Sequence, residues 1–308
     1  MTRRVAVTGA SGFIGGHLTS RLAELGHDVI RIPRPFAPDA LVSAFSQVDV
    51  VVHLAGVIVA NQHGDYVDGN VTSTRIVAEA AQAAGTRLVH VSSLAAAGPA
   101  SPREPRDEAA PSAPITVYGC TKLAGEAAIT GLPRLRWTIL RPGVVYGPGD
   151  RALLPLFRLA CGRIMPLVGV RTAAYTFVYI SDMVRAILAA MSDEATGQIF
   201  FVGHRDPVTA RALIEGIRAA VSGRAVIVPI PRPVLRLAAW AGDLATVARR
   251  GSRRGPVLID SRRYDEVYAE GFVCRVDRLR DRLGVEAQVP LEEGLRQTAR
   301  WYRSENWL

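Results

Sequence analysis

A glycine-rich turn near the start of the chain places the tightest limit on its fold. The segment TGASGFIG carries Gly9, Gly12 and Gly15 directly after the apolar run RRVAVTG and before the helical pattern FIGGHLTSRLAELG. In this context the first glycine permits a tight turn, the second lets backbone approach a pyrophosphate at the helix N-terminus, and the third lets helix and strand pack closely. The turn therefore predicts a dinucleotide-binding unit. The other turn residues that we expect at the ligand are Ser11, Phe13 and Ile14.

Short apolar runs alternate with helical patterns through the first half of the chain. The runs are RRVAVTG, HDVIRI, VDVVVHLAG, TRLVHVSS and RWTILRP, and QIFFVG at 198–203 has the character of one more strand. Helical patterns cover about 39–45, 71–84 and 117–130. Buried strands that alternate with helices are typical of a parallel sheet covered by helices, so we expect an α/β fold with a Rossmann-type doubly wound sheet.

The alternation weakens after residue 150. We expect residues 1–150 to form the dinucleotide-binding Rossmann domain, with a returning strand near 175–203. Residues 151–308 should form mainly a smaller C-terminal substrate-binding lobe, built of helices and loops after residue 203. The ligand crevice of such a sheet lies at the carboxyl ends of its strands, which this lobe should cover.

Composition argues against several other classes of protein. With 49% hydrophobic and 21% charged residues, the chain is typical of a globular rather than a disordered protein. Its three cysteines include no CxxC pair, so we expect no disulfide framework and no metal site, which fits a reducing compartment. There is no signal-peptide pattern and no apolar run of about 18 residues, so we expect a cytoplasmic protein without a membrane span. The net charge of +9 is scattered, and the densest arginine cluster, at 249–255, lacks aromatic residues, which disfavours nucleic acid as a partner.

One lysine stands among the 37 basic residues of the chain. This residue, Lys122, follows Tyr118 by four positions in VYGCTKLAGE, so the two share one face of the predicted helix. A free tyrosine has a pKa of about 10, and a fixed cation beside it lowers that pKa toward the working pH. A compact ammonium with three donors can serve a phenol and a ribose together, which a planar guanidinium does less well. The pair therefore predicts an acid–base site.

Together these motifs resemble the extended short-chain dehydrogenase/reductases, which form the NAD-dependent epimerase/dehydratase family. The resemblance rests on the G-x-x-G-x-x-G turn, HLAG at 53–56, NVTSTRIVAEAA at 70–81, VSS at 91–93, YGCTK at 118–122 and RPGVVYGPGD at 141–150. It implies cofactor contacts beyond the glycine turn. These contacts would come from Leu54, Ala55, Gly56, Asn70, Tyr118, Lys122 and Pro142.

The resemblance also implies a third catalytic residue, a Ser or Thr that ends a strand five residues before a glycine. Counting back from Gly98 gives Ser93, with Ser92 as the alternative. The hydroxyl of this residue would hold the substrate oxygen while Tyr118 transfers a proton and the nicotinamide transfers hydride.

Three functions remain open at this point. Family dehydratases carry an Asp-Glu pair directly after the hydroxyl residue, whereas this chain has Leu94 and Ala95, which disfavours sugar dehydration. We predict an NAD(P)-dependent dehydrogenase or reductase that acts at a secondary alcohol or ketone carbon. The alternative is a nucleotide-sugar 4-epimerase that recycles tightly bound NAD. A non-catalytic dinucleotide-binding sensor is a third hypothesis, which the intact Ser-Tyr-Lys set argues against.

The second strand bears on the choice of cofactor. NAD enzymes usually end this strand with an acidic residue that binds the adenosine ribose. Here DVIRIPRPF supplies Pro33 and then Arg34, and an arginine suits a 2′-phosphate. We therefore predict NADP over NAD. The alternative is that Arg34 stacks on adenine and either cofactor binds.

The substrate is less well defined by the sequence. Segment 231–250 places an apolar set on one helical face, which fits a helix that closes the lobe, a mouth for a lipophilic alcohol or ketone, or a shallow membrane contact. That set is Leu237, Trp240, Ala241, Leu244 and Val247. A nucleotide sugar is the alternative substrate class. The family resemblance implies a homodimer formed through the helices near 71–84 and 117–130.

Overall fold

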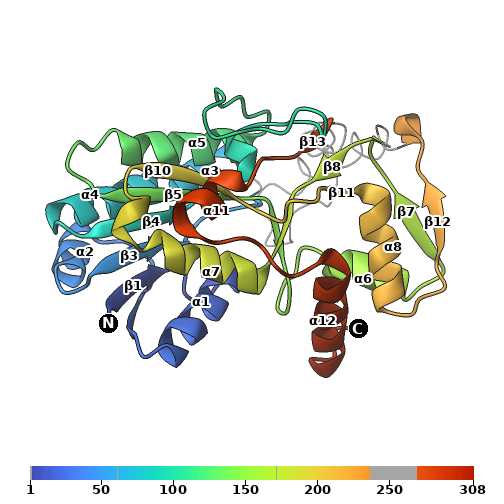
Figure 1. The fold of residues 1–308 in the computed structure, drawn as a ribbon, viewed down its shortest axis with the longest axis horizontal. Coiled ribbons are helices and arrows are strands. Elements are labelled where there is room, and N and C mark those ends of the chain that lie inside the picture. Colours follow the sequence, from blue (N-terminus) through green and yellow to red (C-terminus); the bar gives the residue numbers. More distant parts are fainter. Residues whose placement is uncertain (1, 61, 171, 235, 237–268) are drawn as a thin grey trace.

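The computed structural model describes residues 2–60, 62–170, 172–234, 236 and 269–308 (Figure 1). Its centre is a parallel six-stranded sheet with the strand order β10-β5-β4-β3-β1-β2. The strands are β1 (Arg4–Thr8), β2 (Asp28–Ile32), β3 (Val50–His53), β4 (Arg87–Val91), β5 (Trp137–Pro142) and β10 (Gln198–Val202). Each apolar run singled out in the sequence forms one of these strands, so the predicted Rossmann-type sheet is confirmed.

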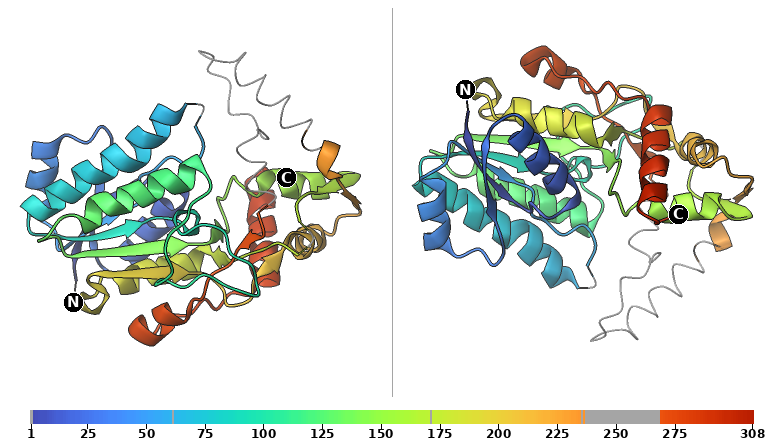
Figure 2. Two further views of the ribbon diagram at one scale, coloured as in Figure 1. Left: turned by 90° about the horizontal axis from the view of Figure 1, so that it is seen from above. Right: turned by 90° about the horizontal axis from the view of Figure 1, so that it is seen from below.

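Helices cover both faces of this sheet (Figure 2). They are α1 (Phe13–Glu24), α2 (Pro38–Phe45), α4 (Ser73–Ala83), α5 (Val117–Thr130) and α7 (Ile180–Ala190). Successive side chains of a strand point to opposite faces of the sheet, so one strand contributes side chains to a core on each face. Val5 and Val7 of β1 pack with α1 and α7, whereas Ala6 between them packs with α2, α4 and α5.

A second core lies toward the C-terminal part of the chain, at the right of Figure 1. Phe157, Ile217 and Tyr302 are fully buried in it. The helices that supply them are α6 (Leu154–Ala160), α8 (Ala210–Ala220) and α12 (Leu291–Ser304). Four further described strands precede residue 203: β6 (Val144–Tyr146), β7 (Ile164–Leu167), β8 (Ala174–Tyr175) and β9 (Phe177–Tyr179). The short helices are α3 (His63–Val67), η1 (Asp68–Thr72), η2 (Leu94–Ala96), η3 (Asp193–Ala195) and, near the C-terminus, α11 (Asp277–Leu283).

The expectation of only helices and loops after residue 203 is wrong. The described residues of this region include three short strands: β11 (Val208–Thr209), β12 (Val226–Pro229) and β13 (Gly271–Phe272). β12 pairs with β7 in parallel, and β11 and β13 flank β8. Strands of two to four residues are too short to show an alternating pattern. Their pairing partners also lie far away in sequence, so the local pattern cannot reveal them.

The proline-rich segment 98–114 is tied to elements from the second half of the chain. Ala100 and Arg106 form β-bridges with Phe272 and Cys274. The Glu108 carboxylate accepts a hydrogen bond from the backbone nitrogen of Phe201 in β10, 3.0 Å away. Among the residues described, no helix has the length and apolar character needed to span a membrane. The apolar helical face expected at 237–247 lies outside the described residues.

Candidate active site

The glycine turn joins β1 to α1 and leaves no room for side chains at two of its glycines. Gly9 has a φ of +68°, a conformation that favours glycine. A Cβ on Gly9 would lie 2.8 Å from the backbone nitrogen of Ala55, and a Cβ on Gly15 would lie 2.1 Å from the carbonyl oxygen of Gly9. The turn therefore packs directly against α1 on one side and against the chain that follows β3 on the other. Gly12 is the N-cap of α1.

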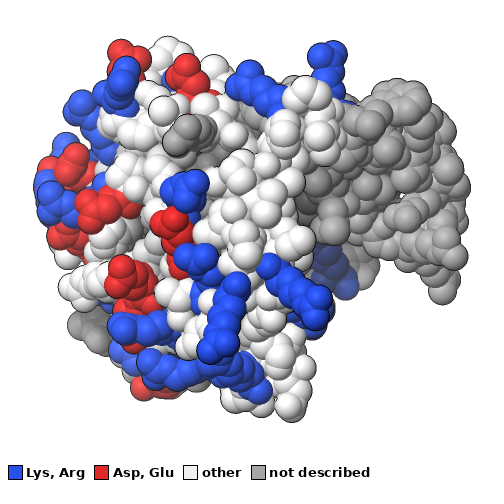
Figure 3. All heavy atoms as spheres, turned by 90° about the vertical axis from the view of Figure 1, so that its right-hand side faces the viewer, with Lys and Arg blue, Asp and Glu red and all other residues white. Residues whose placement is uncertain are grey.

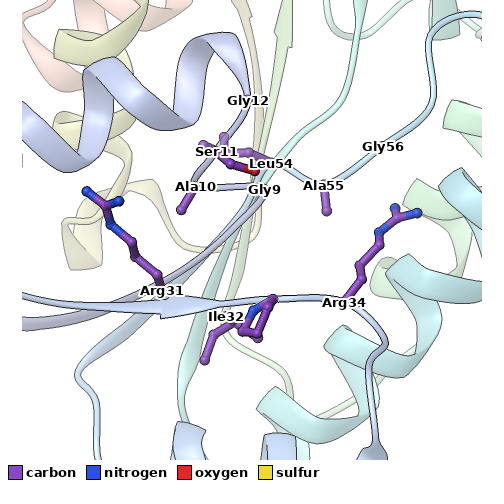
Figure 4. Close-up of a pocket in the computed structure, with 11 residues that line it drawn as sticks. Gly9, Ala10, Ser11, Gly12, Arg31, Ile32, Arg34, Leu54, Ala55 and Gly56 are labelled. Carbon is purple, nitrogen blue, oxygen red and sulfur yellow. The ribbon is translucent and has the colours of Figure 1, made fainter.

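A cavity of about 690 Å³ opens beside this turn, at the carboxyl ends of β1, β2 and β3 (Figure 4). Its lining residues are Gly9, Ala10, Ser11, Gly12, Arg31, Ile32, Pro33, Arg34, Leu54, Ala55 and Gly56. This volume is in the range of small-molecule and cofactor sites. No Asp or Glu is among the lining residues, whereas two arginines are. A glycine turn, a helix N-terminus and a lining without acidic residues together fit a bound dinucleotide.

Half of the predicted cofactor residues line this cavity. They are Gly9, Ser11, Gly12, Arg34, Leu54, Ala55 and Gly56. The others, Phe13, Ile14, Gly15, Asn70, Tyr118, Lys122 and Pro142, do not line it. Phe13 instead lines a second hollow, which shares Ser11 and Gly12 with the cavity. Pro142 is buried at the end of β5. Sequence reasoning did not assign contacts to Ala10, Arg31, Ile32 or Pro33, although the place of Arg31 near the carboxyl end of the second strand was a usable signal.

Arg31 and Arg34 extend from the end of β2 and flank the cavity (Figure 4). The Nη2 atom of Arg34 donates to the carbonyl oxygen of Gly69 at 3.3 Å and lies 3.4 Å from the Ser73 Oγ. The guanidinium also lies 5.6 Å from the ring centre of Phe36. Both arginine side chains are exposed, so this end of the cavity presents two cations to a ligand.

Helix α5 carries Tyr118 and Lys122, and its first turn is fixed by Thr116. The hydroxyl of this N-cap residue accepts a hydrogen bond from the backbone nitrogen of Gly119 at 3.0 Å. Tyr118 is half-buried, whereas Lys122 is 4% exposed. Lys122 Nζ donates to the carbonyl oxygen of Val91 at 2.9 Å. Burial lowers the pKa of Lys122 from 10.5 to about 8.

The ammonium of Lys122 reaches the edge of the cavity. A Cβ placed on Gly56 would lie 3.9 Å from Lys122 Nζ and 3.1 Å from Asn70 Oδ1. The Asn70 amide forms two hydrogen bonds with the backbone of Val57. Its Oδ1 accepts from the Val57 nitrogen at 2.8 Å, and its Nδ2 donates to the Val57 carbonyl oxygen at 2.9 Å. Nδ2 also lies 3.1 Å from the Thr121 Oγ1 on α5. Asn70 thus holds the segment after β3 and the helix of Lys122 together.

Ser92 and Ser93 follow β4 but have different surroundings. Ser92 is buried, and its hydroxyl donates a short hydrogen bond to the Glu126 carboxylate. That carboxylate also forms a buried ion pair with Arg141, with oxygen–Nε distances of 3.0 and 3.1 Å. Ser93 is half-buried, and its Oγ accepts one hydrogen bond, from the backbone nitrogen of Ala95 at 3.2 Å. Of the two serines, Ser93 therefore keeps its hydroxyl hydrogen available for a ligand.

Two buried histidines lie at the ends of β3 and β4, close to Lys122. His53 and His90 are fully buried, and their rings stack at 5.2 Å. His53 binds the hydroxyls of Thr8 and Thr74 at 2.7 and 3.1 Å, and His90 Nε2 lies 3.4 Å from Lys122 Nζ. Burial, with a smaller contribution from the charge of Lys122, lowers the pKa of His53 to about 3 and that of His90 well below its usual value. Both rings are neutral at physiological pH.

Comparison with known proteins agrees with these features. The model of the NAD dependent epimerase/dehydratase family matches residues 5–203, a range that holds the glycine turn, both serines and α5. A ceramide reductase from Caulobacter vibrioides is 29% identical, with 99% of this chain and 96% of that protein covered. A UDP-glucose 4-epimerase from Mycolicibacterium smegmatis is 28% identical, with 98% and 99% covered.

Solved structures are also similar to this chain over nearly its full length. The structure of MoeE5 in complex with UDP-glucose and NAD has a TM-score of 0.78 and 25% sequence identity to this chain. The match covers 98% of this chain and 99% of that one. The match to this structure therefore extends beyond residue 203, where the family model ends.

Proposed function

Because the chain belongs to the NAD-dependent epimerase/dehydratase family, we propose that it is an NAD(P)-dependent dehydrogenase or reductase that acts at a secondary alcohol or ketone carbon. In this proposal Ser93, Tyr118 and Lys122 carry the acid–base chemistry. The nicotinamide, when bound, supplies or accepts the hydride. The observation that carries the proposal is the buried ammonium of Lys122, which lies beside Gly56 at the cavity edge and one helical turn from Tyr118.

Each of the three residues has a physical role that follows from its surroundings. Lys122 is a cation in a poorly solvated position, so it stabilises a nearby phenolate more strongly than it would in water. Tyr118 then exchanges a proton with the substrate oxygen. The Ser93 hydroxyl orients that oxygen, since it is half-exposed and is not committed to the Glu126 carboxylate as Ser92 is.

Replacing Tyr118 with phenylalanine tests the acid–base role. We expect turnover to fall by at least about 100-fold, since general acid–base catalysis contributes about 10²–10⁴, while cofactor affinity stays within a few-fold of wild type. Lys122→Arg keeps the charge but changes the donor geometry, and it should lose most activity as well. Full activity of Tyr118→Phe would show that another group transfers the proton.

We further propose that NADP is preferred over NAD. Support comes from Arg31 and Arg34 at the β2 end of the cavity and from the lack of an acidic residue among its lining residues. A charge-assisted hydrogen bond to phosphate contributes about 1.5–3 kcal/mol, so Arg34→Ala should weaken NADPH binding about tenfold or more and leave NADH binding nearly unchanged. Arg21→Ala, an exposed arginine on α1 away from the cavity, is the matched control. Tighter binding of NADH than of NADPH by the wild-type chain would refute the preference.

Two substrate classes have support from different relatives of the chain. A lipophilic alcohol or ketone has the support of the similarity to a ceramide reductase. A nucleotide sugar, converted by a 4-epimerase with tightly held NAD, has the support of the similarity to a UDP-glucose 4-epimerase and to MoeE5. Denaturing the purified protein and identifying the released nucleotide by mass separates the two. Stoichiometric NAD would favour the epimerase, and an empty protein that binds NADPH would favour the reductase.

We also expect a homodimer through the outer faces of α4 and α5. Cys120, Ala124 and Ala127 are exposed on α5 and are small, which permits close approach of a second helix. Ala124→Glu should therefore produce a monomer in sedimentation velocity. Ala40→Glu, at an exposed position of α2, should leave the assembly unchanged.

A further inference from the structure

The two-stranded ribbon β7–β12 exposes aliphatic side chains on its outer face. Ile164 and Val226 are register partners in this ribbon and are 60% and 63% exposed. Val228, two residues further along β12, is 37% exposed, and Val234 in the segment that follows is 55% exposed. Met165, which points to the other face of β7, is fully buried in the second core. One face of the ribbon is therefore part of the core, and the other is an apolar surface open to the solvent.

The segments that form the ribbon and its flanks are rich in arginine and contain no acidic residue. Segments 153–167 and 216–236 contain six arginines and no Asp or Glu. The arginines are Arg158, Arg163, Arg218, Arg224, Arg232 and Arg236. Arg163 directly precedes Ile164, and its carbonyl oxygen accepts a hydrogen bond from the Val226 nitrogen at 2.9 Å. Figure 3, which views this side of the molecule, shows white and blue atoms across its centre and red atoms gathered toward its left.

We propose that this β7–β12 surface, made of Ile164, Val226, Val228 and Val234 with Arg163, Arg224, Arg232 and Arg236, docks on an anionic lipid membrane. Exposed aliphatic side chains insert at the level of the headgroups, and arginines around them bind lipid phosphates. A protein bound in this way lies on the membrane and needs no spanning helix. The proposal stands apart from the catalytic proposal, because none of these residues belongs to the cavity or to the Ser-Tyr-Lys set.

Charge complementarity favours lipid over the other occupants of such a surface. A second copy of the chain, docked on this surface about a two-fold axis, would bring the two sets of arginines together without an acidic residue from these segments to pair with them. Nucleic acid would also attract arginines, but single-stranded bases bind on aromatic side chains, and the surface residues named above include none. An anionic bilayer supplies both the negative charge and the apolar layer that this surface needs.

Sedimentation of the full chain with vesicles tests the proposal. We expect wild-type protein to bind vesicles of phosphatidylcholine with phosphatidylglycerol and to bind pure phosphatidylcholine far less. Since each arginine near an anionic surface contributes about a fivefold factor in partitioning, Arg163→Gln/Arg224→Gln should weaken binding roughly 10- to 30-fold. The double variant Ile164→Ser/Val226→Ser should also weaken it by at least about tenfold, because both apolar side chains lose their insertion energy.

Matched controls separate this surface from the general basic charge of the chain. Arg134→Gln/Arg282→Gln removes the same charge from exposed positions outside the ribbon, and Leu25→Ser removes an exposed aliphatic side chain at the end of α1. Both should bind vesicles as the wild type does. The proposal is overturned if wild-type protein does not sediment with anionic vesicles, or if the control arginine pair weakens binding as much as Arg163→Gln/Arg224→Gln does.

Self-association is the remaining outcome to separate. Sedimentation velocity without lipid should give the same molecular mass for the wild type and for Ile164→Ser/Val226→Ser. A lower mass for the variant would assign the surface to contact between copies of the chain and would overturn the lipid assignment. Far-ultraviolet circular dichroism establishes that each variant is folded before its binding is compared.

Discussion

Replacing His90 with phenylalanine should make the fold less sensitive to acid. His53 and His90 are fully buried and neutral, and burial is the main cause of their lowered pKa values. In the unfolded chain a histidine has a pKa of about 6.5, so the unfolded state binds protons that the folded state cannot. Stability is therefore fully present above this pKa and is lost as the pH falls from 6.5 toward about 3, the folded-state value of His53.

The size of the effect for His53 follows from its pKa of about 6.5 in the unfolded chain and about 3 in the folded chain. At a pH of about 5, proton uptake by one such histidine in the unfolded chain lowers the free energy of unfolding by about 2 kcal/mol. His90, whose pKa is also lowered well below its usual value by burial, adds to this loss in the same direction. In His90→Phe the ring still stacks on His53, but only one buried histidine remains to titrate. The loss between neutral pH and a pH of about 5 should shrink, by at most about 2 kcal/mol, the limit that an unfolded-state pKa of about 6.5 sets for one histidine.

Urea unfolding followed by the fluorescence of the four tryptophans measures this difference at each pH. The substitution also removes the contact between His90 and Lys122, which changes the free energy of unfolding at every pH. The test therefore compares how the free energy of unfolding changes with pH, and not its value at one pH. His63→Phe, at an exposed position in α3, should keep the wild-type slope. If His90→Phe loses as much stability toward acid as the wild type does, His90 is not held neutral and the reasoning is wrong.

Two further predictions concern the scaffold of the site. Glu126→Gln removes the charge that pairs with buried Arg141 and should lower the free energy of unfolding by about 3–5 kcal/mol; an unchanged urea midpoint would contradict this. Gly15→Ala places a Cβ 2.1 Å from the carbonyl oxygen of Gly9 and should weaken cofactor binding at least about tenfold by pushing α1 off the turn. Gly16→Ala, where a Cβ meets nothing within 4 Å, is the matched control in a fluorescence titration with the cofactor and should bind as the wild type does.

The elements nearest to the candidate site could be predicted because their determinants are local. The helix expected at 117–130 is Val117–Thr130 in the structure, since Thr116 caps its start through a hydrogen bond three residues away. The glycine turn is likewise specified within eight residues, where φ and close packing admit only small side chains. Neither prediction required knowledge of distant residues.

The network under the site could not be predicted, because its members meet only after folding. Glu126 and Arg141 are 15 residues apart and would suit surface positions equally well by type. Packing of α5 on the sheet buries both and brings Ser92 to the same carboxylate. This network, and not the sequence, distinguishes the surroundings of Ser92 from those of Ser93. Arg31 differs from these residues, because its place near the carboxyl end of the second strand is visible in the sequence and already indicates a contact with the cavity.

The surroundings of Lys122 give a physical reason why a chain so rich in arginine has lysine there. Its Nζ bonds the carbonyl oxygen of Val91, lies against His90 Nε2 and approaches within 3.9 Å of a Cβ position on Gly56. These three directions diverge from one atom, which suits the rotatable donors of an ammonium, whereas a guanidinium spreads its donors over a plane and needs more space. Burial also lowers the lysine pKa to about 8, close enough to neutrality for the charge to respond to a bound ligand. An arginine would stay charged at any working pH and would fill the space beside Gly56 that the cofactor needs in the proposed mechanism.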